Sequence, residues 1–172
     1  MKKKKNRGML LGSIGAGKST LTKALLGEEK QAVKTQALVY NDWIVDTPGE
    51  YTENPMYYKN IMATSLEVTH VLFIQDATKK KTIFPPGFST GLNKLPIGVV
   101  TKADSEKADV ERAVKQLRKV IPKGPIVITS AQNGEGLAYI RDLVGFNKLE
   151  EMEAYAKDQA SDELLFNETL YK

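Results

Sequence analysis

Gly12-Ser13-Ile14-Gly15-Ala16-Gly17-Lys18-Ser19 matches the phosphate-binding loop pattern G-x-x-x-x-G-K-[ST]. The segments on either side support the match, because residues 7–11 predict a buried strand and residues 19–26 predict a helix that ends at Gly27. Glycines let backbone N–H groups point inward toward a polyphosphate, and the helix N-terminus adds partial positive charge. We therefore expect Lys18 to reach the β- and γ-phosphates of a nucleotide and the Ser19 hydroxyl to bind Mg²⁺.

Strand and helix patterns alternate along the rest of the chain. The loop's own strand is joined by strand patterns at 35–40, 43–46, 71–76, 96–100 and 125–129, and helix patterns cover 54–66, 105–120 and 136–146. Asn41-Asp42 predicts a hairpin turn, residues 79–94 predict an irregular segment with at most a short helix at its end, and Ser105 is the predicted N-cap of its helix. The pattern predicts a three-layer α/β P-loop NTPase with a six-stranded, mostly parallel sheet.

Composition excludes several other classes of protein. The chain has 172 residues, of which 41% are hydrophobic and 27% charged, and it has no Cys and one His. A disulfide framework, a thiolate metal site and a Ser/His triad are therefore disfavoured. The apolar run Val71–Ile74 is far too short to span a bilayer, and the N-terminal lysines lack an apolar secretory segment behind them. We expect a cytoplasmic protein that has no membrane partner.

Charge is unevenly distributed. The formal net charge is +4, but residues 148–172 carry three lysines against seven acids, so the excess of positive charge lies in residues 1–147. Lys2–Lys5 supply four of the positive charges in one run at the terminus. This run is either a solvated tail or an electrostatic tether to an acidic partner or RNA. The distribution of charge along the whole chain argues against nucleic acid as the main partner.

Two further motifs follow predicted strands, where nucleotide sites of open α/β sheets lie. Asp46-Thr47-Pro48-Gly49 fits D-x-x-G, in which Asp46 would hold Mg²⁺ through water and the Gly49 N–H would meet the γ-phosphate. Thr101-Lys102-Ala103-Asp104 fits [NT]-K-x-D. The Asp104 carboxylate would accept hydrogen bonds from guanine N1–H and its 2-amino group, which adenine does not offer, and the Lys102 stem would pack over the base.

Single residues complete the candidate site. Thr35 is the threonine placed to ligate Mg²⁺ when the γ-phosphate is present, although a threonine that merely starts a strand is the alternative. A backbone N–H in Thr129-Ser130-Ala131 would meet guanine O6. The candidate nucleotide contacts are Gly12, Ser13, Ile14, Gly15, Ala16, Gly17, Lys18, Ser19, Thr20, Gly49, Thr101, Lys102, Asp104, Ser130 and Ala131; the candidate metal ligands are Ser19, Thr35 and Asp46; the candidate catalytic residues are Lys18, Thr35 and Glu50.

The C-terminal stretch, residues 148–172, has helix-forming composition, with Leu149, Met152, Tyr155 and Ala156 spaced three or four apart. We divide the chain into a P-loop GTPase-like domain at 1–147 and a C-terminal helical extension at 148–172. The extension either packs on its own domain or serves as a helix that binds a partner.

In this order, the motifs from residue 8 to residue 146 resemble the GTPase domains related to translation factors. A narrower resemblance, to the EutP/PduV family of ethanolamine and propanediol utilisation, is carried by Lys34-Thr35-Gln36-Ala37, by Asp46 to Tyr51, and by Pro55, Tyr57 and Tyr58. The resemblance implies a Ras-like G domain and an association with bacterial microcompartments. Members on the ethanolamine side are described as acetate kinases, which make acetyl phosphate with ATP, so the resemblance also implies acetate kinase activity.

Three functions therefore remain open. Glu50 occupies the position where GTPases often carry a Gln that orients the attacking water, and an ionised carboxylate there would be repelled by the γ-phosphate. We expect a Mg²⁺-dependent protein that binds GTP and GDP and hydrolyses GTP slowly, with ATP as the alternative nucleotide. The other functions are an acetate kinase and an adaptor that docks on a microcompartment shell or another protein through Lys2–Lys5 or the C-terminal helix.

Overall fold

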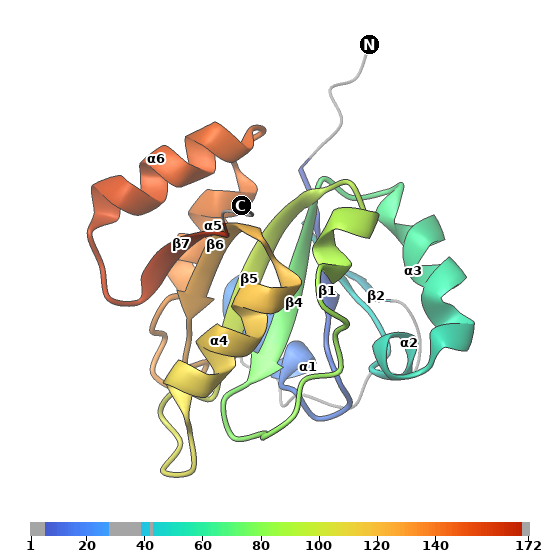
Figure 1. The fold of residues 1–172 in the computed structure, drawn as a ribbon, viewed down its shortest axis with the longest axis horizontal. Helices are drawn as coiled ribbons and strands as arrows, with labels where there is room; N and C mark the ends of the chain where they lie inside the picture. The colour runs from blue at the N-terminus through green and yellow to red at the C-terminus, as the bar shows by residue number, and fades with distance from the viewer. Residues whose placement is uncertain (1–5, 28–38, 42, 170–172) are drawn as a thin grey trace.

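A twisted β-sheet with helices on both faces forms the framework of the structure (Figure 1). The computed structural model describes residues 6–27, 39–41 and 43–169. The strand order is β2-β3-β1-β4-β5-β6-β7; the five central strands are parallel, and β2 and β7 pair antiparallel to their neighbours at the two edges. The strands are β1 (Gly8–Leu11), β2 (Val39–Asn41), β3 (Ile44–Asp46), β4 (His70–Asp76), β5 (Leu95–Thr101), β6 (Lys123–Ile128) and β7 (Leu164–Glu168).

The helices connect these strands and confirm most of the predicted order. They are α1 (Lys18–Leu26), α2 (Glu50–Glu53), α3 (Tyr58–Ser65), α4 (Val110–Val120), α5 (Leu137–Val144) and α6 (Leu149–Gln159), with short 3₁₀ helices at η1 (Pro55–Tyr57) and η2 (Phe88–Gly91). The predicted helix at 54–66 is divided into η1 and α3, and the Asn54 side chain caps η1 by accepting from the Met56 N–H at 3.0 Å. Among the described helices, none is long and apolar enough to cross a membrane.

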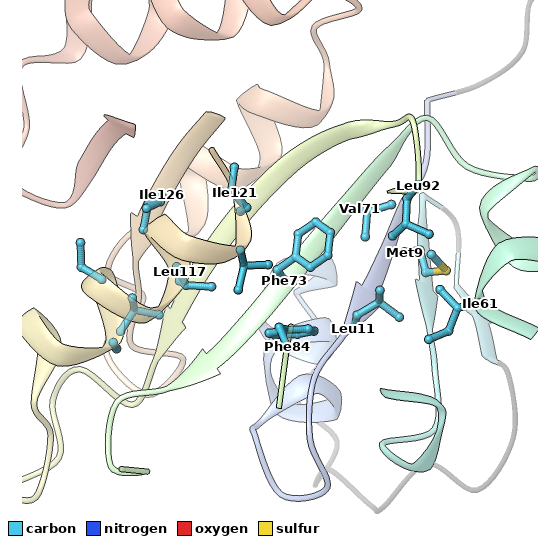
Figure 2. Packing of buried hydrophobic residues seen from close by; sticks show 14 of the residues in the cluster. Met9, Leu11, Ile61, Val71, Phe73, Phe84, Leu92, Leu117, Ile121 and Ile126 are labelled. Carbon is cyan, nitrogen blue, oxygen red and sulfur yellow. The ribbon is translucent and has the colours of Figure 1, made fainter. Parts of the chain in front are cut away.

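Alternation along the central strands explains the three layers. Successive side chains of a strand point to opposite faces, so Val71 and Phe73 of β4 pack in one hydrophobic cluster while Leu72 and Ile74 pack in the other. The first cluster lies under α3 and α4, and the second under α1, α5 and α6. Figure 2 shows the first cluster, where Phe84 from the irregular segment packs edge-on against Phe73 with ring centroids 5.5 Å apart. The α/β fold class is thereby confirmed.

The helix predicted from Ser105 begins later than expected. Its N-cap is Asp109, whose carboxylate accepts a hydrogen bond from the Arg112 N–H at 3.0 Å. The Asp109 N–H itself is bound by the carbonyl oxygen of Ala77, which fixes the point where the helix starts. The Ser105 hydroxyl instead accepts from the Lys107 N–H within a turn, so the prediction of Ser105 as the cap is wrong.

The C-terminal extension contains a strand that the sequence analysis did not predict. The helix prediction holds for α6, but residues 164–168 form β7, the seventh strand of the sheet. Pairing with β7 covers the edge of β6, which would otherwise present unpaired backbone groups. Met152, Ala156 and Leu164 are buried against the second cluster, so the extension packs on its own domain.

Candidate nucleotide-binding site

The loop between β1 and α1 lies at the carboxyl end of β1, which pairs in parallel with β3 and β4, and ligands of open α/β sheets bind at this edge. Gly15 and Gly17 have φ values of 79° and 96°, a left-handed conformation that side chains with a Cβ rarely adopt. Glycine is therefore required by the backbone path at these two positions.

Lys18 is buried and folds back over this loop. Its ammonium donates to the carbonyl oxygens of Gly12 and Ser13, each at 3.0 Å. Burial lowers the pKa of Lys18, and the carboxylates of Asp46 and Glu53 partly oppose that shift. The Lys18 ammonium therefore lies at the loop where the sequence analysis expects a polyphosphate to bind.

Ser19 and Asp46 lie side by side at the ends of α1 and β3. The Ser19 hydroxyl donates to Asp46 Oδ2 at 3.1 Å. The next residue, Thr47, anchors this segment because its buried hydroxyl donates to the Leu10 carbonyl oxygen of β1 at 2.6 Å. Mg²⁺ prefers oxygen ligands and commonly takes one or two from the protein and the remainder from phosphates and water, so this adjacent pair fits a magnesium site.

Gly49 approaches the phosphate-binding loop closely. A Cβ added to Gly49 would lie 2.7 Å from both the N and the Cα of Ile14, a contact that the backbone of Ile14 cannot accommodate. The segment after Gly49 makes a second contact, because the Ile14 N–H donates to Glu53 Oε1 at 3.3 Å. Glu50, the predicted water-orienting position, is exposed at the start of α2.

A cavity of about 430 Å³ lies beside the end of the loop. Parts of α1 and the segments that follow β5 and β6 form its walls, and both Lys102 and Asp104 line it. The residues that line it are Gly17, Thr20, Leu21, Thr101, Lys102, Asp104, Ser105, Thr129, Ala131 and Gln132. The structure therefore brings the predicted base-recognition residues next to the predicted phosphate site.

Asp76 is a residue of this region that the sequence analysis missed. It ends β4, is 1% exposed, and accepts from the Lys102 ammonium at 2.8 Å; the same ammonium donates to the Gly15 carbonyl oxygen at 2.9 Å. Burial alone would raise the pKa of Asp76, but the hydrogen bonds from Lys102 and Thr78 outweigh it and hold that pKa below its ordinary value. The only sequence signal was an acid at the carboxyl end of an apolar strand.

Ser130 and Ala131, both predicted to contact the nucleotide, differ in their position relative to the cavity, because Ala131 lines it and Ser130 is not among its lining residues. The backbone N–H of Ser130 already donates to the Glu135 carbonyl oxygen at 3.2 Å, and its hydroxyl accepts from the Asn133 N–H. Ala131 lines the cavity, so Ser130 supports the loop that presents Ala131. Thr35 and Lys2–Lys5 lie outside the described residues.

A parallel strand, a loop that turns at two left-handed glycines and a lysine folded over that loop place the chain among the P-loop nucleotide-binding proteins. Comparison with known proteins identifies the family within this class. The chain belongs to the PduV-EutP family, described as ethanolamine utilisation - propanediol utilisation, whose family profile matches residues 5–145.

Individual relatives agree with this assignment. The chain is 40% identical over 96 residues to the propanediol utilization protein PduV of Citrobacter freundii. These aligned residues make up 56% of this chain and 64% of that protein. It is 35% identical over 138 residues to the probable acetate kinase EutP of Salmonella typhimurium, which covers 79% of this chain and 85% of that protein. Its fold is similar to bacterial selenocysteine-specific elongation factor EF-Sec, with a TM-score of 0.61 and 20% identity over 89% of this chain and 29% of that one.

Proposed function

We propose that this protein binds guanine nucleotides with Mg²⁺ and hydrolyses GTP slowly. The observation that carries the proposal is the cavity in which Asp104 and Lys102 lie beside the phosphate-binding loop. A carboxylate there would pair with guanine N1–H and the 2-amino group. Adenine lacks these two donors, so it would leave the Asp104 carboxylate desolvated and without hydrogen bonds. A buried polar group that loses its partners in this way gives strong discrimination between guanine and adenine.

The phosphate end of the site favours chemistry at the γ-phosphate. Lys18 would move from its loop carbonyls to the β- and γ-phosphate oxygens, while Ser19, Asp46 and the predicted Thr35 would hold the metal. When bound, Mg²⁺ would neutralise charge on these phosphates. The Gly49 N–H would position the γ-phosphate beside Ile14.

Slow hydrolysis follows from the residues near that position. Glu50 is exposed and acidic, so it would orient an attacking water poorly beside a negatively charged phosphate. A slow enzyme of this kind serves as a switch between two nucleotide states. The name of the family supports a role in ethanolamine or propanediol utilisation, with an association with a bacterial microcompartment as part of the proposal.

Calorimetry with GTP, GDP and ATP, each with and without Mg²⁺, tests the proposal. We expect tighter binding of the guanine nucleotides and a requirement for Mg²⁺ that is stronger for the triphosphate. Phosphate release from GTP at several per second without any partner would contradict the slow switch, and equal affinity for ATP and GTP would contradict the role of Asp104.

Acetate kinase activity is a second candidate, supported by the relative named probable acetate kinase EutP, which is similar over 138 residues. Acetate is already a nucleophilic anion, so phosphoryl transfer to it would need no general base, and Lys18 with Mg²⁺ would suffice. Trapping acetyl phosphate as its hydroxamate, with ATP and GTP in parallel, separates the two functions. Hydroxamate formation that depends on Lys18 would favour the kinase.

A further inference from the structure

We infer that Glu53 determines how strongly this site discriminates between nucleoside triphosphates and diphosphates. The inference rests on the proposed nucleotide binding and adds a specificity residue that neither sequence motif contains. It concerns the carboxylate of Glu53, which lies four residues after the D-x-x-G glycine.

The first observation is a hydrogen bond between Glu53 and the phosphate-binding loop. Glu53 Oε1 accepts from the backbone N–H of Ile14 at 3.3 Å. Ile14 is the third residue of a loop whose N–H groups bind anions. A side-chain carboxylate is thus already held at the rim of the anion site.

The second observation places this contact at the γ end of the site. Gly49, whose N–H is expected to meet the γ-phosphate, packs directly on the backbone of Ile14. One turn of α2 separates Gly49 from Glu53, and the Glu53 N–H donates to the Gly49 carbonyl oxygen at 3.4 Å. This turn carries the Glu53 carboxylate to the same N–H that borders Gly49.

The negative charge of Glu53 is expected to affect how tightly a triphosphate binds. Glu53 is close enough to Lys18 to influence it electrostatically, so Glu53 lies within electrostatic range of the lysine that would bind the β- and γ-phosphates. A γ-phosphate adds negative charge beside Glu53, whereas a diphosphate ends before it. Repulsion therefore weakens triphosphate binding selectively, and the triphosphate must displace Glu53 from Ile14.

The test compares GDP and GTP, with Mg²⁺, by calorimetry on the full chain and on the Glu53→Gln variant. Glutamine keeps an oxygen that accepts from Ile14 but removes the charge. The preference for GTP over GDP should increase about tenfold at low ionic strength, and the increase should shrink at high salt because the contact is exposed. Glu53→Ala should increase the preference in the same direction, and both variants should melt near the wild-type temperature.

Glu150→Gln on α6 is the matched control, since it removes an exposed carboxylate remote from the loop and should leave the preference unchanged. If both nucleotides bind but Glu53→Gln changes the preference by less than twofold, or in the opposite direction, the inference is overturned and the proposed function stands. If the wild-type chain binds neither GDP nor GTP, the proposed function itself fails.

Discussion

The Lys102 ammonium lies 2.8 Å from the Asp76 carboxylate, and Asp76 is 1% exposed. The same ammonium bonds to the Gly15 carbonyl oxygen, so one side chain connects the end of β4, the segment after β5 and the phosphate-binding loop. A buried partner limits the rotamers of a long, flexible lysine. Asp76 therefore acts as a positioning residue for the stem that would cover the base.

Asp76→Asn tests this role. An amide replaces the ion pair, so the Lys102 stem is held less firmly and affinity for GDP should fall about tenfold, or ~1.4 kcal/mol. Inorganic tripolyphosphate has no base, and its affinity should not change. Calorimetry with both ligands measures the difference. An equal loss for GDP and tripolyphosphate would show that Asp76 only maintains the loop.

Asp104→Asn should change which base is bound. The amide presents a donor where the carboxylate presented only acceptors, so it matches the additional carbonyl of xanthine and no longer matches the 2-amino group of guanine. We expect affinity for GDP to fall about a hundredfold and affinity for xanthosine diphosphate to rise. Competition binding with the two diphosphates measures the exchange. Unaltered preference for guanine would remove Asp104 from base recognition.

The residues that the sequence predicted well are those whose spacing has a mechanical reason. The backbone is left-handed at Gly15 and Gly17 and passes close to Ile14 at Gly49, and each of these conditions favours glycine. Glycine at these positions of a motif therefore indicates the backbone geometry directly. Asp76 carries no such spacing, since its partner Lys102 lies 26 residues away and only the pairing of β4 with β5 brings them together.

Local patterns also misled where two signals competed. Leu164-Leu165-Phe166 follows a helical composition, but the edge of β6 offers backbone pairing that outweighs helix propensity, and β7 results. Ser105 and Asp109 are both good caps; the bond from the Asp109 N–H to Ala77 decides between them.

Lys18→Ala should separate binding from folding. The ammonium is buried against carbonyl oxygens, and burial disfavours its charge and lowers the pKa of Lys18, so removing it should leave the melting temperature unchanged or higher. Affinity for GTP should fall about a hundredfold or more because the charge-assisted bonds to phosphate are lost. Calorimetry and thermal melts measure the two effects. Lys115→Ala, on the exposed side of α4, is the control and should bind normally.

His70 should make the stability depend on pH. It is fully buried at the start of β4, with Nδ1 2.7 Å from the Thr69 hydroxyl, and burial lowers its pKa to about 4 despite the backbone oxygens of Phe146 and Leu143, which favour the protonated form. Between its ordinary pKa of about 6.5 and the folded value, the unfolded chain binds a proton that the folded chain does not. The free energy of unfolding should therefore fall by about 2 kcal/mol from pH 7.5 to pH 5.

Urea unfolding at several pH values in this range measures that slope, and the range stays above the pKa values of ordinary carboxylates. His70→Leu removes the titrating ring and should flatten the slope, whatever its effect on absolute stability. A slope that is the same in the variant and the wild type would assign the pH dependence to other groups.

Asn167→Ala tests whether the C-terminal extension stabilises the domain through α4. The Asn167 side chain donates to the Ile121 carbonyl oxygen at 2.8 Å and lies 3.4 Å from those of Arg118 and Pro122, at the end of α4. Removing this amide takes the 2.8 Å hydrogen bond from the Ile121 carbonyl oxygen at the helix C-terminus, so the free energy of unfolding should fall by about 1 kcal/mol. Urea unfolding measures the loss, with Gln159→Ala at the exposed end of α6 as the control. Affinity for GDP should not change, and a variant as stable as the wild type would show that β7 covers the edge of β6 without supporting α4.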